Sequence, residues 1–241
     1  MDTMRMKAIL VFVAAVAFAS APLWSGGFGG FDPNLYPIPQ DDPPIQPAGY
    51  AFSIWGVIYL WLLAHGAFGL FARSDDAGWD RTRWPLIVSL APGAAWISVA
   101  QISPLWATVL IWVMLGGALA ALFLAPRDRD RWLLIAPLGL YAGWLTAASA
   151  VSLGLLGAGY GVGGFGSLVW AWIALVIALL LSLGIQDRRP GAPEYGIAVA
   201  WALAAITAAN WGGYIGLAGS AGVGAVVLLT AAFQGLRHRR A

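Results

Sequence analysis

Long apolar runs alternate with short polar connections throughout this chain, and each run is long enough to cross a lipid bilayer. A helix needs roughly 17–25 apolar residues to span the hydrocarbon core, because lipid offers backbone amides and carbonyls no partner outside the helix. No Asp, Glu, Lys or Arg interrupts the interior of a run. The pattern predicts an all-α polytopic bundle of about eight transmembrane helices, over residues 6–24, 51–71, 84–103, 105–125, 132–156, 167–185, 195–213 and 214–236.

The positive charges lie in alternate connections between these runs. The connections after the first, third, fifth and seventh runs contain no Lys or Arg. Because short cytoplasmic loops retain Lys and Arg, an even number of spans with both termini inside is predicted. The thirteen cations are Arg5, Lys7, Arg73, Arg81, Arg83, Arg127, Arg129, Arg131, Arg188, Arg189, Arg237, Arg239 and Arg240.

The first run has two interpretations. Its basic start, its apolar stretch and the small residues Ala17, Ala19 and Ala21 are also typical of a secretory signal with a cleavage site. Removing it would leave seven spans. We expect it to be retained as a helix, which keeps the number of spans even.

The amino-acid composition excludes or disfavours several kinds of site and function. The chain is 60% hydrophobic and 10% charged, whereas a soluble domain has roughly 25% charged residues. It has no cysteine, so neither a disulfide framework nor a thiolate metal site can form. Ionisable residues inside spans usually mark ion-coupled transport, and their scarcity in this chain disfavours proton-driven pumping. The net charge of +2 reflects the cytoplasmic flanks and does not indicate a nucleic-acid partner.

The longest connection, residues 25–50, is rich in Gly and Pro and carries acidic residues but no cation. Proline stiffens the chain, and Phe28, Phe31 and Tyr36 give the segment apolar surface to pack. A connection of this length in a compact protein is more often a binding element than a plain linker. We therefore favour a lid on the outer side over a passive tether.

Two of the predicted helices carry stripes that mix aromatic and small residues. With helical spacing, one stripe holds Trp55, Tyr59, Leu62 and Gly66, and the other holds Tyr141, Trp144, Ala148 and Ser152. Such faces suit a cavity for a flat apolar ligand, in which a few polar groups fix orientation. They equally suit ordinary helix packing, where small residues permit close approach. Geometry alone leaves both interpretations open.

Two motifs resemble signatures of the TspO/MBR family, the tryptophan-rich sensory proteins. Residues 47–60 (PAGYAFSIWGVIYL) are similar to the start of that family's second helix, and residues 141–148 (YAGWLTAA) to its fifth. Trp96 fits the family's third-helix Trp, and Ser152 stands where the family has Asn. The resemblance implies a five-helix core over residues 1–156, including the lid at 25–50, and a three-helix extension over 157–241 typical of a larger, eight-helix branch.

The resemblance also implies an interior pocket under the lid that binds tetrapyrroles and, in some members, sterols. No cofactor is required, although a bound porphyrin or haem-like tetrapyrrole is expected. No catalytic residue and no metal ligand set is legible. His65, Gln101 and Asn210 are candidates for axial or polar contacts, although a lone histidine is more often a neutral hydrogen-bonding group. The candidate ligand-binding residues are Trp55, Tyr59, Trp96, Tyr141, Trp144, Ala148 and Ser152.

These expectations favour a membrane sensory or transport protein that binds a planar hydrophobic molecule. The alternative is a structural or assembly subunit of a larger membrane complex, whose tryptophans would face lipid and partner. A third hypothesis, oxidative breakdown of a bound porphyrin, has no identifiable catalytic residue. Partners would be the bilayer, the hydrophobic ligand and a second copy or larger complex. Usage rich in Ala, Gly and Arg, with one Lys, indicates a bacterial cytoplasmic membrane.

Overall fold

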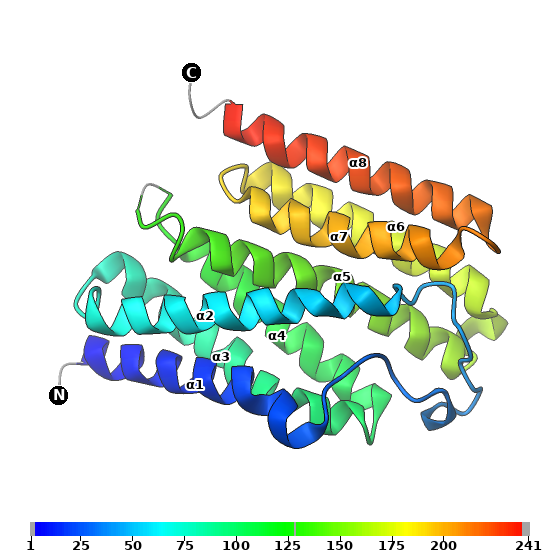
Figure 1. The fold of residues 1–241 in the computed structure, drawn as a ribbon, viewed down its shortest axis with the longest axis horizontal. Coiled ribbons are helices and arrows are strands. Elements are labelled where there is room, and N and C mark those ends of the chain that lie inside the picture. Colours follow the sequence, from blue (N-terminus) through cyan, green and yellow to red (C-terminus); the bar gives the residue numbers. More distant parts are fainter. Residues whose placement is uncertain (1–2, 128, 238–241) are drawn as a thin grey trace.

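A computed structural model describes residues 3–127 and 129–237, and this part of the chain forms eight α-helices without a β-strand (Figure 1). The predicted eight-helix bundle is confirmed. Three short 3₁₀ turns lie between helices, namely η1 (Pro33–Leu35), η2 (Gly49–Ser53) and η3 (Val162–Gly164). The helices are α1 (Thr3–Ser25), α2 (Ile54–Phe71), α3 (Ala77–Ala100), α4 (Pro104–Leu124), α5 (Ile135–Gly159), α6 (Ser167–Arg188), α7 (Pro193–Asn210) and α8 (Ile215–Arg237).

Six of these helices are long and apolar enough to cross a membrane by length and composition, so the chain is a multi-pass membrane protein. The other two are α3 and α7. Helix α3 begins with charged turns that contain Asp80, Arg81 and Arg83. Helix α7 has Glu194 in its first turn and buries much of its surface inside the bundle. Both therefore have less apolar character than the helices that face lipid.

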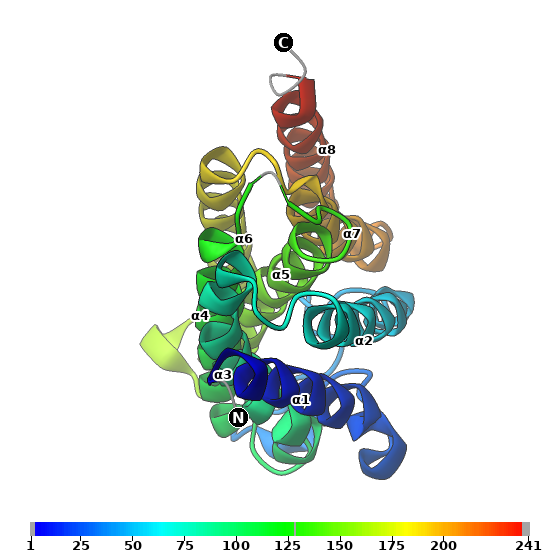
Figure 2. The same cartoon turned by 90° about the vertical axis from the view of Figure 1, so that its left-hand side faces the viewer.

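Helix α5 is the centre of the bundle. It packs against α2 and α4 on one side and α6 and α7 on the other (Figure 2). Its sequence is rich in Gly, Ala and Ser, which lets neighbouring backbones approach closely. At Gly143 an added Cβ would lie 2.9 Å from the carbonyl carbon of Tyr195 on α7. The predicted division of the chain into a core that ends at residue 156 and a C-terminal extension stays a prediction. Helix α5 itself continues past that boundary to Gly159 and packs against helices that come before it and after it in the sequence.

One end of the bundle carries most of the charge. Helix α1 begins and α8 ends there, and the connections α2–α3, α4–α5 and α6–α7 lie at the same end (Figure 1). We call it the basic end and treat it as cytoplasmic, as the distribution of Lys and Arg predicts. Arg239 and Arg240 lie outside the described residues. The ion pairs at this end are Lys7–Asp80, Arg83–Asp80, Arg73–Asp130, Arg129–Asp76 and Arg131–Glu194.

The outer loop, residues 25–50, crosses the opposite end and is held down at several points. The amide of Ile38 donates to the carbonyl of Gly159 at 2.9 Å, and the amide of Ala48 donates to that of Ala205 at 3.2 Å. The ring of Tyr36 lies where a side chain on residue 159 would be. The loop is thus fixed to both α5 and α7.

Candidate functional site

Aromatic side chains from six segments, the outer loop among them, line two adjoining chambers at this end of the bundle. The α5 chamber has a volume of about 40 Å³ and the α2 chamber about 320 Å³. Phe28, Phe52, Trp96 and Ile111 line both and therefore form the wall between them. The α5 chamber is also lined by Trp144, Ala148 and Ser152, and the α2 chamber by Phe18, Trp55 and Tyr59.

The outer loop and η2 contribute Phe28 and Phe52 to the wall between the chambers, and α3 and α4 contribute Trp96 and Ile111. The ring of Phe28 lies 4.7 Å from that of Trp96 and 5.7 Å from that of Phe52, in both cases edge to face. Phe31 adds a further edge-to-face contact with Phe28 at 5.2 Å. Such pairs are favourable, each by about 0.5–1.5 kcal/mol beyond the area they bury. The loop residues therefore close the site with contacts that a flat aromatic ligand could replace.

Helix α2 supplies a stacked pair to its chamber. The rings of Trp55 and Tyr59 lie 5.3 Å apart and 17° from parallel. Phe18 on α1 packs edge-on against both, at 5.7 Å and 5.1 Å. The predicted stripe on α2 thus faces a cavity at Trp55 and Tyr59.

Trp144 is the most informative residue in the α5 chamber. Its side chain is 2% exposed, and its indole N–H has no hydrogen-bond acceptor among the described residues. A buried polar group without a partner costs about 1–3 kcal/mol. Ala148 and Ser152 continue the same face of α5 along the chamber. An unpaired donor is therefore buried beside the α5 chamber.

Trp96 has a different role from Trp144. Its indole N–H donates to the carbonyl of Ala107 on α4 at 2.9 Å, so its ring is fixed in position. It lines both chambers. Trp96 therefore offers a ligand a rigid aromatic face, without a free donor.

Tyr141 lines neither chamber, so its assignment as a ligand-binding residue stays a prediction. It is fully buried, and its hydroxyl lies 2.9 Å from the hydroxyl of Ser89 on α3. Ser89 in turn donates to the carbonyl of Met114 on α4 at 2.6 Å. Tyr141 lies on one edge of the α5 stripe, and this edge packs against α3 and α4, away from the chambers. Its polar atom joins three helices.

Removing the hydroxyl of Tyr141 tests this placement. We expect Tyr141→Phe to lower the stability of the bundle by about 0.5–1.5 kcal/mol, the net value of one hydrogen bond. Ligand affinity should stay unchanged, because the ring remains and lines no chamber. Thermal unfolding in detergent and a ligand titration would measure the two quantities. A loss of affinity at unchanged stability would contradict the placement.

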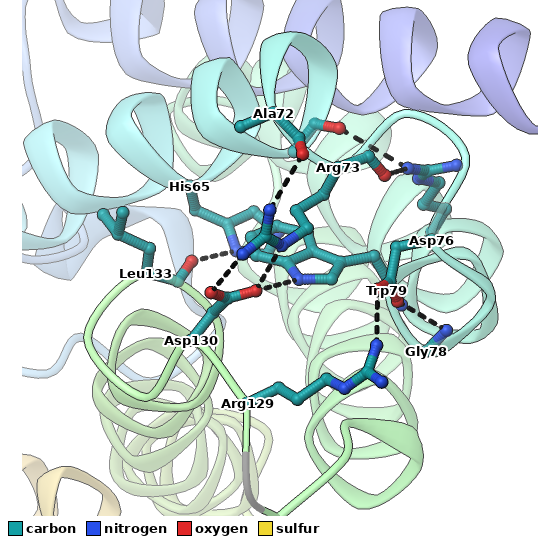
Figure 3. Close-up of polar contacts among 11 residues, drawn as sticks. His65, Ala72, Arg73, Asp76, Gly78, Trp79, Arg129, Asp130 and Leu133 are labelled. Atoms are coloured by element: carbon teal, nitrogen blue, oxygen red, sulfur yellow. Dashed lines mark hydrogen bonds and ion pairs between the residues drawn. The ribbon is translucent and has the colours of Figure 1, made fainter.

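His65 lies at the basic end and lines neither chamber, so an axial contact with a ligand stays a prediction. Its Nδ1 is 2.8 Å from the carbonyl oxygen of Leu133, and its ring stacks on Trp79 at 4.9 Å (Figure 3). The indole N–H of Trp79 donates to the carboxylate of Asp130 at 2.8 Å. The same carboxylate accepts from Nε and Nη2 of Arg73 at 2.8 Å and 3.0 Å. His65 is thus part of an interhelical polar network.

The carboxylates of this network have lowered pKa values. Hydrogen bonds from Arg73 lower the pKa of Asp130, and they outweigh the effect of burial, while the Trp79 N–H adds to the lowering. At Asp76, burial acts to raise the pKa, but the amides of Trp79 and Gly78 and the side chain of Arg129 together lower it. Both groups are therefore charged at neutral pH.

We expect these two carboxylates to stabilise the protein above the ordinary Asp pKa of about 3.9 and to lose that contribution as the pH falls through their lowered values. Melting temperature should therefore change little between about pH 7 and pH 5 and then fall below about pH 4. The double variant D76N/D130N should melt lower at neutral pH and lose part of the acid-dependent fall. Equal acid dependence of the two proteins would contradict this.

Gln101 and Asn210 hold the outer loop and line neither chamber, so their assignment as candidate polar contacts stays a prediction. The side-chain amide of Gln101 donates to the carbonyl of Ser25 at 2.5 Å. That of Asn210 donates to the carbonyls of Pro44 and Ile206, each at 2.8 Å. Carbonyls of an irregular segment need such donors, because the segment has no helical partners.

Sequence reasoning missed Phe18 and Phe52 as lining residues. Phe18 is an isolated aromatic residue in α1, so no stripe indicated its orientation. Phe52 lies in η2, just before α2, where helical periodicity does not apply. The aromatic residues of the outer loop were expected to pack, and the structure shows Phe28 and Phe31 packed against Trp96.

The lining of the two chambers is mainly aromatic and aliphatic, with the hydroxyl-bearing Ser152 and the amide-bearing Gln46 in the α5 chamber. Within the described residues, no group of three or more His, Cys, Asp or Glu residues could hold a metal ion. Such a lining can contact an apolar molecule by stacking and a few hydrogen bonds.

We compared the chain with models of protein families, with curated proteins and with solved structures. A sequence model of the TSPO-like protein family matches residues 8–234, which include the three C-terminal helices as well as the first five. Searches of curated proteins and of solved structures found no match.

Proposed function

The chain belongs to the TSPO-like protein family, and from this premise we propose that it is a membrane receptor for a planar hydrophobic molecule. The proposed ligand is a porphyrin or a related tetrapyrrole, with a sterol-like lipid as the other candidate. It would bind between the rings that line the two chambers. The observation that carries the proposal is the buried, unpaired N–H of Trp144, because a buried donor without a partner suits a site that a ligand completes.

The dimensions of the chambers determine how such a ligand would enter. Pockets for small molecules commonly have volumes of about 300–1,000 Å³, so the α2 chamber is near the lower limit and the α5 chamber admits only a few water molecules. A macrocycle would need both. Outward movement of Phe28 and Phe52 would join them, so the outer loop acts as the lid in this proposal.

Binding would serve a regulatory or transport role at a bacterial cytoplasmic membrane. The alternative, a structural subunit of a larger complex, would place the motif tryptophans toward lipid or a partner. Trp96 and Trp144 are instead 6% and 2% exposed and line a cavity. Their burial favours the receptor proposal over the alternative.

The proposal is tested by titrating protoporphyrin into the protein in lipid nanodiscs and following tryptophan fluorescence. We expect saturable quenching that Trp55→Ala weakens, because its ring forms one wall of the α2 chamber. Trp211→Ala is the matched control, since Trp211 is 72% exposed. Equal affinity of the two variants, or no saturation in the unaltered protein, would contradict the proposal.

A further inference from the structure

Helix α2 connects the ligand chamber with one short segment at the basic end. Trp55 and Tyr59 line the α2 chamber. Farther along the same helix and just beyond it, three side chains reach residues 130–133, which lie between α4 and α5. Trp61 donates to the carbonyl of Trp132 at 2.7 Å, His65 Nδ1 lies 2.8 Å from the carbonyl oxygen of Leu133, and Arg73 contacts Asp130.

Within this segment, the side chain of Asp130 joins Arg73 to Trp79. Its carboxylate accepts two hydrogen bonds from Arg73 and one from Trp79 (Figure 3). Its backbone has φ of +42°, in the left-handed region that Asp and Asn adopt more readily than other residues with a side chain. The turn at Asp130 is therefore held in this conformation by side chains that belong to α3 and to the connection after α2.

Trp79 makes this contact sensitive to the position of α2. Its ring stacks on His65 at 4.9 Å and lies against Gly69, where an added Cβ would be 2.9 Å from the ring. Both of these residues are on α2. A displacement of α2 must therefore move the indole whose N–H binds Asp130.

Helix α2 lies less deeply inside the bundle than its neighbour α5. Only 28% of its spanning window is buried, against 83% for α5. Its end is held separately by Arg83 of α3, which donates to the carbonyl of Arg73 at 2.7 Å. Arg83 therefore anchors the chain just after α2, at a point about two turns beyond His65.

We propose that Arg73, His65, Trp79 and Asp130 form a latch through which occupancy of the α2 chamber controls the turn at residues 130–133. This inference rests on the proposed function, since it assigns the regulation of that same site. A ligand seated against Trp55 and Tyr59 displaces α2 from its outer end as far as His65. His65 and Trp79 then withdraw from Leu133 and Asp130, and the turn changes its conformation. The connection that contains Arg127, Arg129 and Arg131 then presents a different surface to a cytoplasmic partner, while the ion pairs of Arg129 with Asp76 and of Arg131 with Glu194 still hold it to the bundle.

Coupling between two sites is reciprocal, so opening the latch must loosen the outer half of α2 even without ligand. The first test uses Asp130→Asn, which removes the charge while Asn still tolerates the left-handed conformation. We expect hydrogen exchange in the empty protein to accelerate at residues 126–134 and also at residues 49–60. Arg73→Gln should give the same result. Arg83 keeps the end of α2 in place, so both variants should fold.

The matched control is Asp75→Asn. Asp75 lies in the same connection as Asp76 and has no hydrogen bond or ion pair within the described part of the chain. It should leave exchange at residues 49–60 unchanged. Acceleration confined to residues 126–134 in Asp130→Asn would overturn the latch, whether or not any ligand is known.

The second test adds protoporphyrin. Binding to the unaltered protein should accelerate exchange at residues 126–134, and Asp130→Asn should bind about fivefold or more tightly, the lower bound of typical allosteric coupling. Binding without either effect would overturn the latch and leave the proposed function standing. Absence of binding would refute the proposed ligand, while the ligand-free comparison would still decide whether the two ends of α2 are coupled.

Discussion

Replacing Trp144 with phenylalanine should weaken porphyrin binding by up to about tenfold and leave the empty protein about as stable as before. The net value of one hydrogen bond is about 0.5–1.5 kcal/mol, and 1.4 kcal/mol corresponds to tenfold in affinity. In the empty protein the same N–H has no acceptor within the described residues. Removing this N–H stabilises the empty protein, because an unpaired buried donor is lost. This gain offsets the loss of packing that the smaller phenylalanine ring causes.

Trp170→Phe is the matched control for this result. Trp170 lines neither chamber, and its indole N–H donates to the carbonyl of Val162 at 3.1 Å. The same substitution there should lower the stability and leave the affinity unchanged. Thermal unfolding and fluorescence titration of both variants would measure the contrast. If Trp144→Phe destabilised the protein and spared the affinity, Trp144 would be a packing residue and not a ligand contact.

Gly143→Ala should destabilise the protein strongly, because a methyl group on this residue has no room between α5 and α7. The added Cβ would lie 2.9 Å from the carbonyl carbon of Tyr195 and closer still to its carbonyl oxygen. Both atoms belong to the backbone of α7, so the clash can be relieved only by moving α5 and α7 apart. Overpacking a core typically costs about 1–3 kcal/mol, and more where backbone must shift.

Gly116→Ala on α4 is the matched control, because an added Cβ there meets nothing within 4 Å. It should leave the melting temperature unchanged or raise it, since Ala favours a helix over Gly by about 1 kcal/mol. Separation of α5 and α7 should also break the contact between the hydroxyls of Thr146 and Tyr195, which lie 2.9 Å apart. Equal melting temperatures of the two variants would contradict the close packing of α5 on α7.

The sequence was sufficient to predict the helices, because a long apolar run in lipid satisfies its backbone hydrogen bonds by forming a helix. It placed their boundaries less well where charge and capping decide them. The third helix was predicted from residue 84, but α3 begins at Ala77, because the carboxylate of Asp76 accepts from the amides of Gly78 and Trp79 and caps it. Hydropathy does not detect a helix that continues beyond the membrane into charged residues.

The candidate site could be predicted in part. The family resemblance and the stripes identified Trp55, Tyr59, Trp96 and Trp144, all of which line a chamber. They did not separate Trp144 from Tyr141, because periodicity defines a face of α5 but not which neighbour covers each edge of it. The lining by Phe18 and Phe52 depends on how segments distant in sequence meet, which no local pattern encodes.

The most direct test of the account is an experimental density map of the protein prepared with protoporphyrin. The account predicts density for a flat molecule between Trp96 and Trp144 that extends toward Trp55, with Phe28 moved away from Trp96 and an acceptor atom of the ligand near the indole N–H of Trp144. Density for the molecule on the lipid-facing surface, with Phe28 still packed on Trp96 and both chambers unchanged, would contradict it.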